Sequence, residues 1–161
     1  MRSLKLLATA AIVMLSGTTA LAGDSTQTPS PASVKALWDF YSNGWTNQAV
    51  VGEFKLCLEV DTERKSATRF ECSQAAAGTL EQGTRVYAWL AYLMPKGSET
   101  EDVMVQFKHN GIVRTTHDLT LKGKFMRNRS YTSHKLNKSG EWQIVVLQNG
   151  AELASATVTV Q

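Results

Sequence analysis

The sequence GEWQIVVLQNGAELASATVTVQ, from Gly140 to Gln161, contains two stretches in which apolar and polar residues alternate. In the first, Trp142, Ile144 and Val146 lie on one face of an extended chain, and the second alternates between alanine or valine and serine or threonine. Asn149-Gly150 between them suits the two positive φ angles of a type I′ turn. The pattern predicts a β-hairpin with Trp142 in the core. Because an isolated hairpin is not stable in water, its apolar face has to close over other strands of the chain.

The first 22 residues have the pattern of a secretory signal peptide. Basic Arg2 and Lys5 precede an apolar run, and Ala20-Leu21-Ala22 forms a small-residue end, so we predict cleavage after Ala22. The apolar run is shorter than the roughly 20 residues of a membrane span, and we expect no transmembrane segment. Residues 23–32 are rich in Ser, Thr and Pro and are predicted to be a disordered leader. The chain is therefore expected to be a periplasmic or secreted protein with one domain, residues 33–161.

A short amphipathic helix is predicted at the start of this domain, over residues 33–43. An apolar stripe has the spacing i, i+3, i+4, i+7 and consists of Val34, Leu37, Trp38 and Tyr41. Ser33 is the expected N-cap, and Gly44 ends the pattern. We interpret the aromatic stripe as the face that docks on the domain, with a ligand platform as the alternative.

Period-two patterns dominate the remaining chain. Phe54, Leu56, Leu58 and Val60 alternate with polar residues and Cys57 and predict a half-buried strand, which residues 68–73 would pair as a return strand. Residues 84–94 are apolar on both faces, which predicts a central strand. Asn110-Gly111 predicts a second tight hairpin, and residues 125–132 another strand. About seven or eight short strands and one leading helix predict an all-β protein, an antiparallel β-sandwich.

The chain has two cysteines, Cys57 and Cys72, and both lie after the signal peptide. An oxidising compartment favours a disulfide between them. A redox-active pair is the alternative, but the spacing differs from Cys-x-x-Cys. We therefore predict a structural disulfide on the hairpin.

Basic residues are concentrated in one part of an almost neutral chain. Without Arg2 and Lys5, 15 basic residues remain against 14 acidic ones, and residues 108–138 hold eight basic residues and one acid. Guanidinium groups flanked by aromatic rings can bind anions or stacked rings, whereas a solvated sheet face is the alternative. The candidate basic binding face consists of Lys122, Lys124, Arg127, Arg129 and Tyr131, and Phe125 would share a strand face with the two arginines and the tyrosine.

The residues that could carry catalysis form no recognisable motif. His109, His117 and His134 fall in separate strand ends or loops, without Cys or carboxylate at a metal-ligand spacing. No nucleotide-binding or nucleophile motif is present in the sequence. Glu99, Glu101 and Asp102 lie in a polar loop that offers no apolar surround to raise a carboxyl pKa. We predict no catalytic residues, no metal and no cofactor.

From Thr84 onward the chain shows, in order, RVYAWLAYL, VMVQFKHNG, FMRNRSYTSHKL and the closing hairpin. This order resembles a bacterial envelope family known as domain of unknown function 2914. The best-matched parts are residues 127–133, Gly140-x-Trp142 and Asn149-Gly150. The resemblance implies an immunoglobulin-like β-sandwich and an envelope location, and it carries over no site residues.

The leading functional hypothesis is a non-catalytic binding or accessory module of the bacterial envelope. Its partner would be an envelope polysaccharide or an envelope protein, and we do not expect nucleic acid. One alternative is a small periplasmic hydrolase or lyase whose site includes His117, His134 and the acidic loop, which requires a histidine within hydrogen-bond reach of a carboxylate. The other is a basic surface that binds an anionic polymer. The sequence does not determine the oligomeric state.

Overall fold

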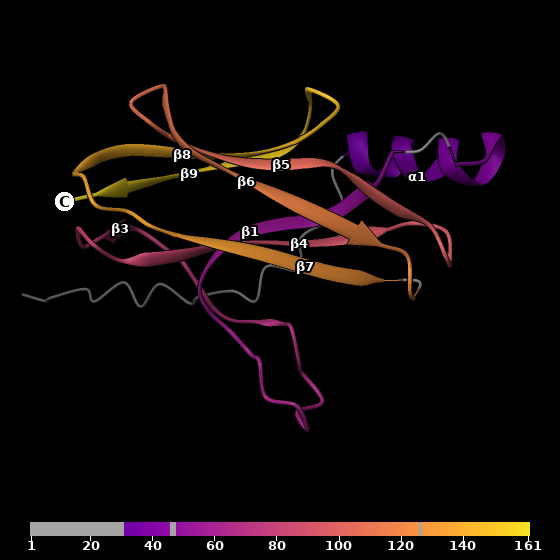
Figure 1. The fold of residues 1–161 in the computed structure, drawn as a ribbon, viewed down its shortest axis with the longest axis horizontal. Coiled ribbons are helices and arrows are strands. Elements are labelled where there is room, and N and C mark those ends of the chain that lie inside the picture. Colours follow the sequence, from indigo (N-terminus) through magenta and orange to yellow (C-terminus); the bar gives the residue numbers. More distant parts are fainter. Residues whose placement is uncertain (1–30, 46–47, 126) are drawn as a thin grey trace, which may run out of the picture.

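Two stacked β-sheets form the protein in a computed structural model, which describes residues 31–45, 48–125 and 127–161 (Figure 1). The predicted signal peptide and nearly all of the predicted leader lie outside these residues. The elements in chain order are α1 (Pro31–Asn43), β1 (Val50–Val60), β2 (Cys72–Ala75), β3 (Thr79–Leu80), β4 (Arg85–Leu93), β5 (Glu99–His109), β6 (Ile112–Lys122), β7 (Asn128–Lys135), β8 (Gly140–Gln148) and β9 (Ala151–Val160).

The first sheet has the strand order β2-β1-β4-β7 and the second β3-β9-β8-β5-β6. All strand pairs are antiparallel except β3 with β9, which run parallel. β1, β4 and β7 take the positions of strands A, B and E of an immunoglobulin-like sandwich, and β5, β8 and β9 take those of C, F and G. β6 extends the second sheet beside β5, as strand C′ does. The fold is therefore an immunoglobulin-like β-sandwich, as predicted.

The main core lies between the sheets, and the closing hairpin supplies much of it. Trp142 and Ile144 of β8 pack there with Phe107 of β5 and Leu90 of β4, and Trp142 is only 2% exposed. The prediction that Trp142 is a core residue is confirmed. Asn149 and Gly150 have φ values of 51° and 80°, which are the two positive angles expected for the type I′ turn.

A second, smaller cluster covers the outer face of the first sheet. Trp89 and Ala91 of β4 point to this side, whereas their neighbours Leu90 and Tyr92 point into the main core. Cys57 and Val60 of β1 are the other buried members of this outer cluster. β4 is thus buried on both faces and lies between β1 and β7, as its continuous apolar pattern predicted.

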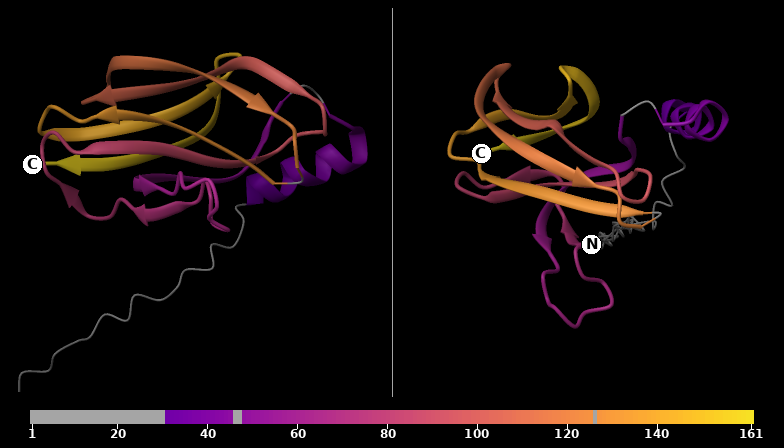
Figure 2. Two further views of the ribbon diagram at one scale, coloured as in Figure 1. Left: turned by 60° about the horizontal axis from the view of Figure 1, so that its bottom comes forward. Right: turned by 45° about the vertical axis from the view of Figure 1, so that its right-hand side comes forward.

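Several strand boundaries differ from the sequence predictions. The return strand expected at residues 68–73 is β2, which begins only at Cys72, and a turn-rich loop occupies residues 61–71. This 61–71 loop projects away from the sandwich (Figure 2). β5 begins at Glu99, so Glu99, Glu101 and Asp102, which were expected in a loop, all lie in this strand. β7 begins at Asn128 rather than at residue 125, because the Asn128 side chain bonds to the backbone N–H groups of Lys124 and Phe125 and holds a turn there.

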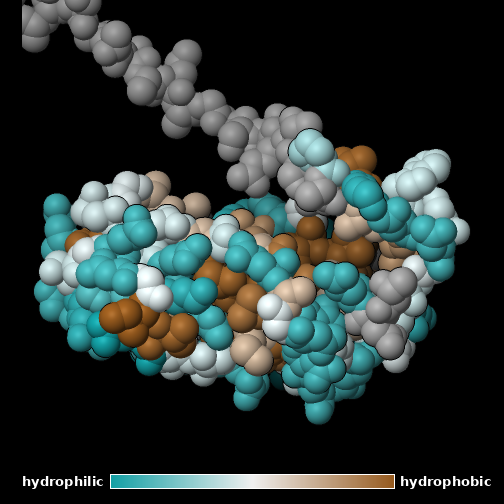
Figure 3. Space-filling view, turned by 90° about the horizontal axis from the view of Figure 1, so that it is seen from above, coloured by the Kyte–Doolittle hydropathy of each residue, from teal (hydrophilic) through white to brown (hydrophobic). Residues whose placement is uncertain are grey.

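α1 begins at Pro31, two residues before the predicted start, so Ser33 lies in its first turn rather than at the cap. Proline suits the first helical position because the missing N–H has no intrahelical partner there. Val34, Trp38 and Tyr41 are 53%, 72% and 65% exposed, so the prediction that this stripe docks on the domain is wrong. The helix stands at one end of the sandwich, and a hollow with hydrophobic side chains separates the two at the right of Figure 3.

No helix among the described residues is long and apolar enough to cross a membrane.

Candidate functional site

The outer face of the first sheet places the predicted arginines beside the 61–71 loop. Arg129 and Tyr131 alternate along β7, and Arg127 precedes the strand by one residue. The ring of Tyr131 lies between those of Phe70 and Tyr87, at centroid distances of 6.3 and 5.9 Å. The predicted common face of Arg127, Arg129 and Tyr131 is therefore found, whereas Phe125 lies outside the strand.

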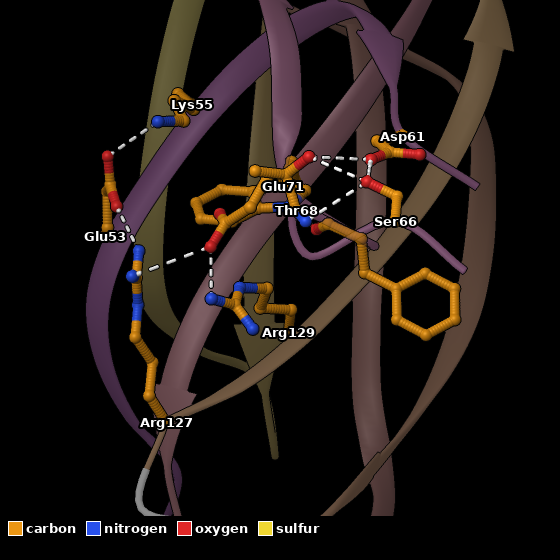
Figure 4. Close-up of polar contacts among 10 residues, drawn as sticks. Glu53, Lys55, Asp61, Ser66, Thr68, Glu71, Arg127 and Arg129 are labelled. Carbon is orange, nitrogen blue, oxygen red and sulfur yellow. Dashed lines mark hydrogen bonds and ion pairs between the residues drawn. The ribbon is translucent and has the colours of Figure 1, made fainter. Parts of the chain in front are cut away.

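Two glutamates bind these arginines (Figure 4). Arg129 donates to Glu71, and both side chains are a little over a quarter exposed. Arg127 donates to Glu53 at 3.1 Å and lies 3.8 Å from Glu71. Lys55 also contacts Glu53 at 2.8 Å. These ion pairs join the loop to β7 and β1, so much of the positive charge is already balanced within the protein.

Asp61 organises the loop from its base. Its carboxylate accepts hydrogen bonds from the hydroxyls of Ser66 and Thr68 and from the backbone N–H of Glu63. The Ser66 bond, followed by the other two, lowers the pKa of Asp61 below its usual value because each bond favours the ionised form. At the other end of the loop, the backbone oxygen of Phe70 accepts a 2.7 Å bond from the Trp89 indole. The loop is thereby fixed to the outer cluster.

The Cys57–Cys72 disulfide closes the base of the same hairpin, as predicted. Cys72 lies opposite Val60 rather than opposite Cys57, because register shifts interrupt the pairing of β1 with β2. The Cα atoms of the two cysteines are nevertheless 5.8 Å apart, within the range that a disulfide spans. Cys57 is completely buried, so the disulfide also belongs to the outer cluster.

A groove of about 330 Å³ runs between Phe70 and Phe125, which are 37% and 72% exposed, and we call it the Phe70–Phe125 groove. Its lining includes four members of the predicted basic face, namely Lys122, Lys124, Arg127 and Arg129. Tyr131, the fifth member, is not part of the lining but contacts Phe70. The structure thus brings cations from the end of β6, the following turn and β7 to one concave surface beside two exposed aromatic rings.

The two lysines of the groove differ in their surroundings. Lys122 contacts Glu99 at 2.6 Å, and this bond raises the pKa of the lysine. Lys124 has no ion pair in the described part of the chain. Lys124 is therefore the cation of this group that is most available to a ligand.

The three histidines come from separate strands, with His109 and His134 near strand ends as predicted and His117 within its strand, but the structure brings their rings together. The rings of His117 and His134 are 5.9 Å apart, and both contact Phe107. His109 and His134 both contact the Trp142 ring. Burial, and then the nearby His117 and Arg85, lower the pKa of His134.

The hydrogen bonds of the histidines go to a hydroxyl and a backbone carbonyl. The Nδ1 atom of His117 lies 3.1 Å from the Thr132 hydroxyl, and the Nε2 atom of His109 lies 2.8 Å from the Ser139 carbonyl. Within residues 31–45, 48–125 and 127–161, no histidine bonds to a carboxylate, and no three potential ligands are grouped to hold a metal. The acidic Glu99 lies at the opposite end of β5 from His109.

Sequence reasoning missed Glu53, Glu71 and Phe70. Each is separated from Arg127 and Arg129 by more than fifty residues, and their contact depends on the order of the strands in the sheet. Glu71 directly precedes Cys72, so the predicted disulfide was the one signal that fixed its neighbourhood.

Comparisons with known proteins identify no family. No family model matches the chain, and no curated protein sequence does. Among solved structures, an immunoglobulin-like protein from Pseudomonas aeruginosa is similar at 13% identity and a TM-score of 0.44, over 73% of this chain and 100% of that one. A Pseudomonas fluorescens alkylpurine DNA glycosylase, AlkC, matches at 15% identity and a TM-score of 0.41, over 53% of this chain and only 28% of the glycosylase. The CARDB domain of a Pyrococcus furiosus protein matches at 14% identity and a TM-score of 0.34, over 52% of this chain and 86% of the domain.

Proposed function

We propose that the protein is an exported, non-catalytic binding module of the bacterial envelope, and that it recognises an envelope polysaccharide in the Phe70–Phe125 groove. The observation that carries this proposal is the meeting of exposed aromatic rings and hydrogen-bond donors on one concave surface. The volume of about 330 Å³ is near the lower end of ligand pockets, so it suits a short segment of a glycan chain better than a folded partner.

The side chains of the groove match the chemistry of a sugar ring. Phe125, which is 72% exposed, offers a flat apolar surface for stacking against the apolar face of a ring, whereas Phe70 offers only the part of its ring that Arg69, 4.4 Å from the ring centroid, leaves open. Arg127 and Lys124 offer charged donors for hydroxyl or carboxylate oxygens, which form stronger hydrogen bonds than neutral donors do. Arg129 lies deeper and remains bound to Glu71. The groove thus combines a stacking surface with directional polar contacts.

The balance of charges favours a glycan of low charge over a highly charged polymer. Glu53, Glu71 and Glu99 already pair with Arg127, Arg129 and Lys122. A polyanion would have to displace these carboxylates, and its binding would weaken steeply with added salt. We expect the affinity of the protein for the glycan to decrease little from low to physiological salt concentration.

Two further observations support an envelope location. The Cys57–Cys72 disulfide is typical of proteins in oxidising compartments. The first 22 residues have the composition of a signal peptide. Membership of the domain of unknown function 2914 remains part of the proposal, and it depends on the order of segments from Thr84 to the closing hairpin.

The test is retention of envelope glycans by the immobilised protein, with the fold verified by circular dichroism. Arg127→Ala should lower retention about tenfold or more, because a hydrogen bond from a charged donor is lost. The matched control is Arg114→Ala, which removes an exposed arginine on β6 that does not line the groove. No retention by the wild-type protein, or equal loss in both variants, would contradict the proposal. Retention that disappears between 50 and 200 mM salt would favour the polyanion instead.

A further inference from the structure

A second hollow, distinct in character from the groove, lies between α1 and the end of β4. It has a volume of about 290 Å³ and a mostly apolar lining that includes Leu37, Tyr41, Met94 and Phe125. Leu37 and Tyr41 come from the helix, and Met94 directly follows β4. The helix therefore stands over an open apolar hollow instead of filling it.

The outer side of the helix is also apolar. Val34, Trp38 and Tyr41 follow the spacing i, i+4, i+7 and are all more than half exposed. Phe125 is 72% exposed at the rim of the same hollow. Large apolar side chains gathered in this way are uncommon on a free surface and mark contact with a partner or a membrane.

The charges beside the hollow are positive. Lys96 and Lys124 line it, and none of its lining residues is acidic. Neither lysine has an ion pair among the residues that the structure describes. On the helix itself, Lys35 contacts Asp39 at 2.6 Å, so these two charges balance each other.

We propose that α1 and Phe125 dock the protein on a membrane surface that contains anionic phospholipid. Trp and Tyr favour the boundary between headgroups and acyl chains, where Trp38 and Tyr41 would insert. Lys96 and Lys124 would lie at the level of the phosphates, and the hollow would receive the upper part of an acyl chain. The helix has 13 residues and is about 20 Å long, so it would lie flat in the interface.

This surface does not depend on the proposed glycan groove, although Lys124 and Phe125 line both hollows. The tests therefore avoid these two shared residues. Arg127→Ala should impair glycan retention and leave membrane binding unchanged. Changes at Trp38 or Lys96 should do the reverse.

The experiment is sedimentation with vesicles of phosphatidylcholine alone or mixed with phosphatidylglycerol. It uses the chain that begins at Gly23, because an apolar leader would itself bind lipid, and because the core is built from residues 49–160. Only the mixed vesicles should retain the protein strongly. Trp38→Ser with Tyr41→Ser should weaken this binding about tenfold or more, because two inserted rings are lost. Ile112→Ser is the control, since Ile112 is an apolar residue that is 58% exposed on β6, away from the helix.

Charge and fluorescence provide independent readouts. Lys96→Glu should weaken binding to the mixed vesicles, whereas Lys138→Glu, an exposed lysine outside the hollow, should not. Trp89 and Trp142 are buried and Trp45 is partly buried, so most of a blue shift of tryptophan emission on binding should be lost in Trp38→Phe while binding persists. Equal binding to both vesicle types, equal effects of test and control variants, or no binding would overturn the proposal. Binding of monomeric dodecyl phosphate without binding to vesicles would also overturn it and indicate a site for a soluble amphiphile.

Discussion

Removal of the disulfide should cost about 3 kcal/mol of unfolding free energy, because the bond closes a loop between cysteines 15 residues apart. The estimate follows from the entropy that the cross-link removes from the unfolded chain. A domain of this size has roughly 5–15 kcal/mol of stability, so the reduced protein should remain folded but unfold at a lower temperature, by about 10 °C.

The assay is urea unfolding followed by tryptophan fluorescence, on the oxidised protein, the reduced protein and the variant Cys57→Ala with Cys72→Ala. The variant should lose roughly 1 kcal/mol more than the reduced protein, because it also removes the buried Cys57 sulfur from the outer cluster. The slope of free energy against urea should increase in both, since an unfolded chain without the cross-link exposes more surface. A loss below about 1 kcal/mol in the reduced protein would refute the entropic reasoning.

Three further outcomes are expected from named side chains. Trp142→Ala should cost about 3–5 kcal/mol in urea unfolding, because the ring is buried in the main core. Gly123→Ala should lower the free energy of unfolding by about 3 kcal/mol, because the new Cβ would lie 1.9 Å from the Pro95 carbonyl oxygen. Gly52→Ala is the control and should change this free energy little, because its new Cβ would meet its nearest atom at 3.8 Å. Burial lowers the pKa of His134 in the folded protein, so the unfolded state is protonated before the folded state as the pH falls. The contribution of the neutral histidine to the free energy of unfolding should therefore be fully present above about pH 7 and decrease below about pH 6.5. His134→Gln should flatten this part of the pH profile, and an unchanged profile would contradict the assignment.

The strands that local pattern determines were predictable from the sequence. The Asn149-Gly150 and Asn110-Gly111 turns both adopt the two positive φ angles that this dipeptide favours. β4 was recognised as central because a strand covered on both faces needs no polar side. These features depend on neighbouring residues, so they need no knowledge of the strand order.

The candidate site was only partly predictable, because its contacts join distant segments. The basic residues were identified, but their pairing with Glu53 and Glu71 follows from the order β2-β1-β4-β7, which the sequence does not state. The histidines looked unrelated for the same reason, since β6 and β7 belong to different sheets and meet only when the sandwich closes. The prediction for the helix was wrong for a different reason. Its spacing indicated an apolar stripe correctly, but an apolar stripe does not reveal whether its partner belongs to the same chain.

The arrangement of the second sheet imposes an order of assembly on the chain as it is synthesised. Its inner strands β8 and β9 are made after every other strand, yet β8 pairs with β5 and β9 pairs with β3. Until β8 has been made, the edge of β5 that faces away from β6 therefore has no paired strand. Phe107 of β5 likewise lacks the Trp142 and Ile144 side chains that pack with it in the core. A chain threaded through a membrane pore in the unfolded state would benefit from this delay, because the sandwich cannot close before the Asn149-Gly150 turn has emerged.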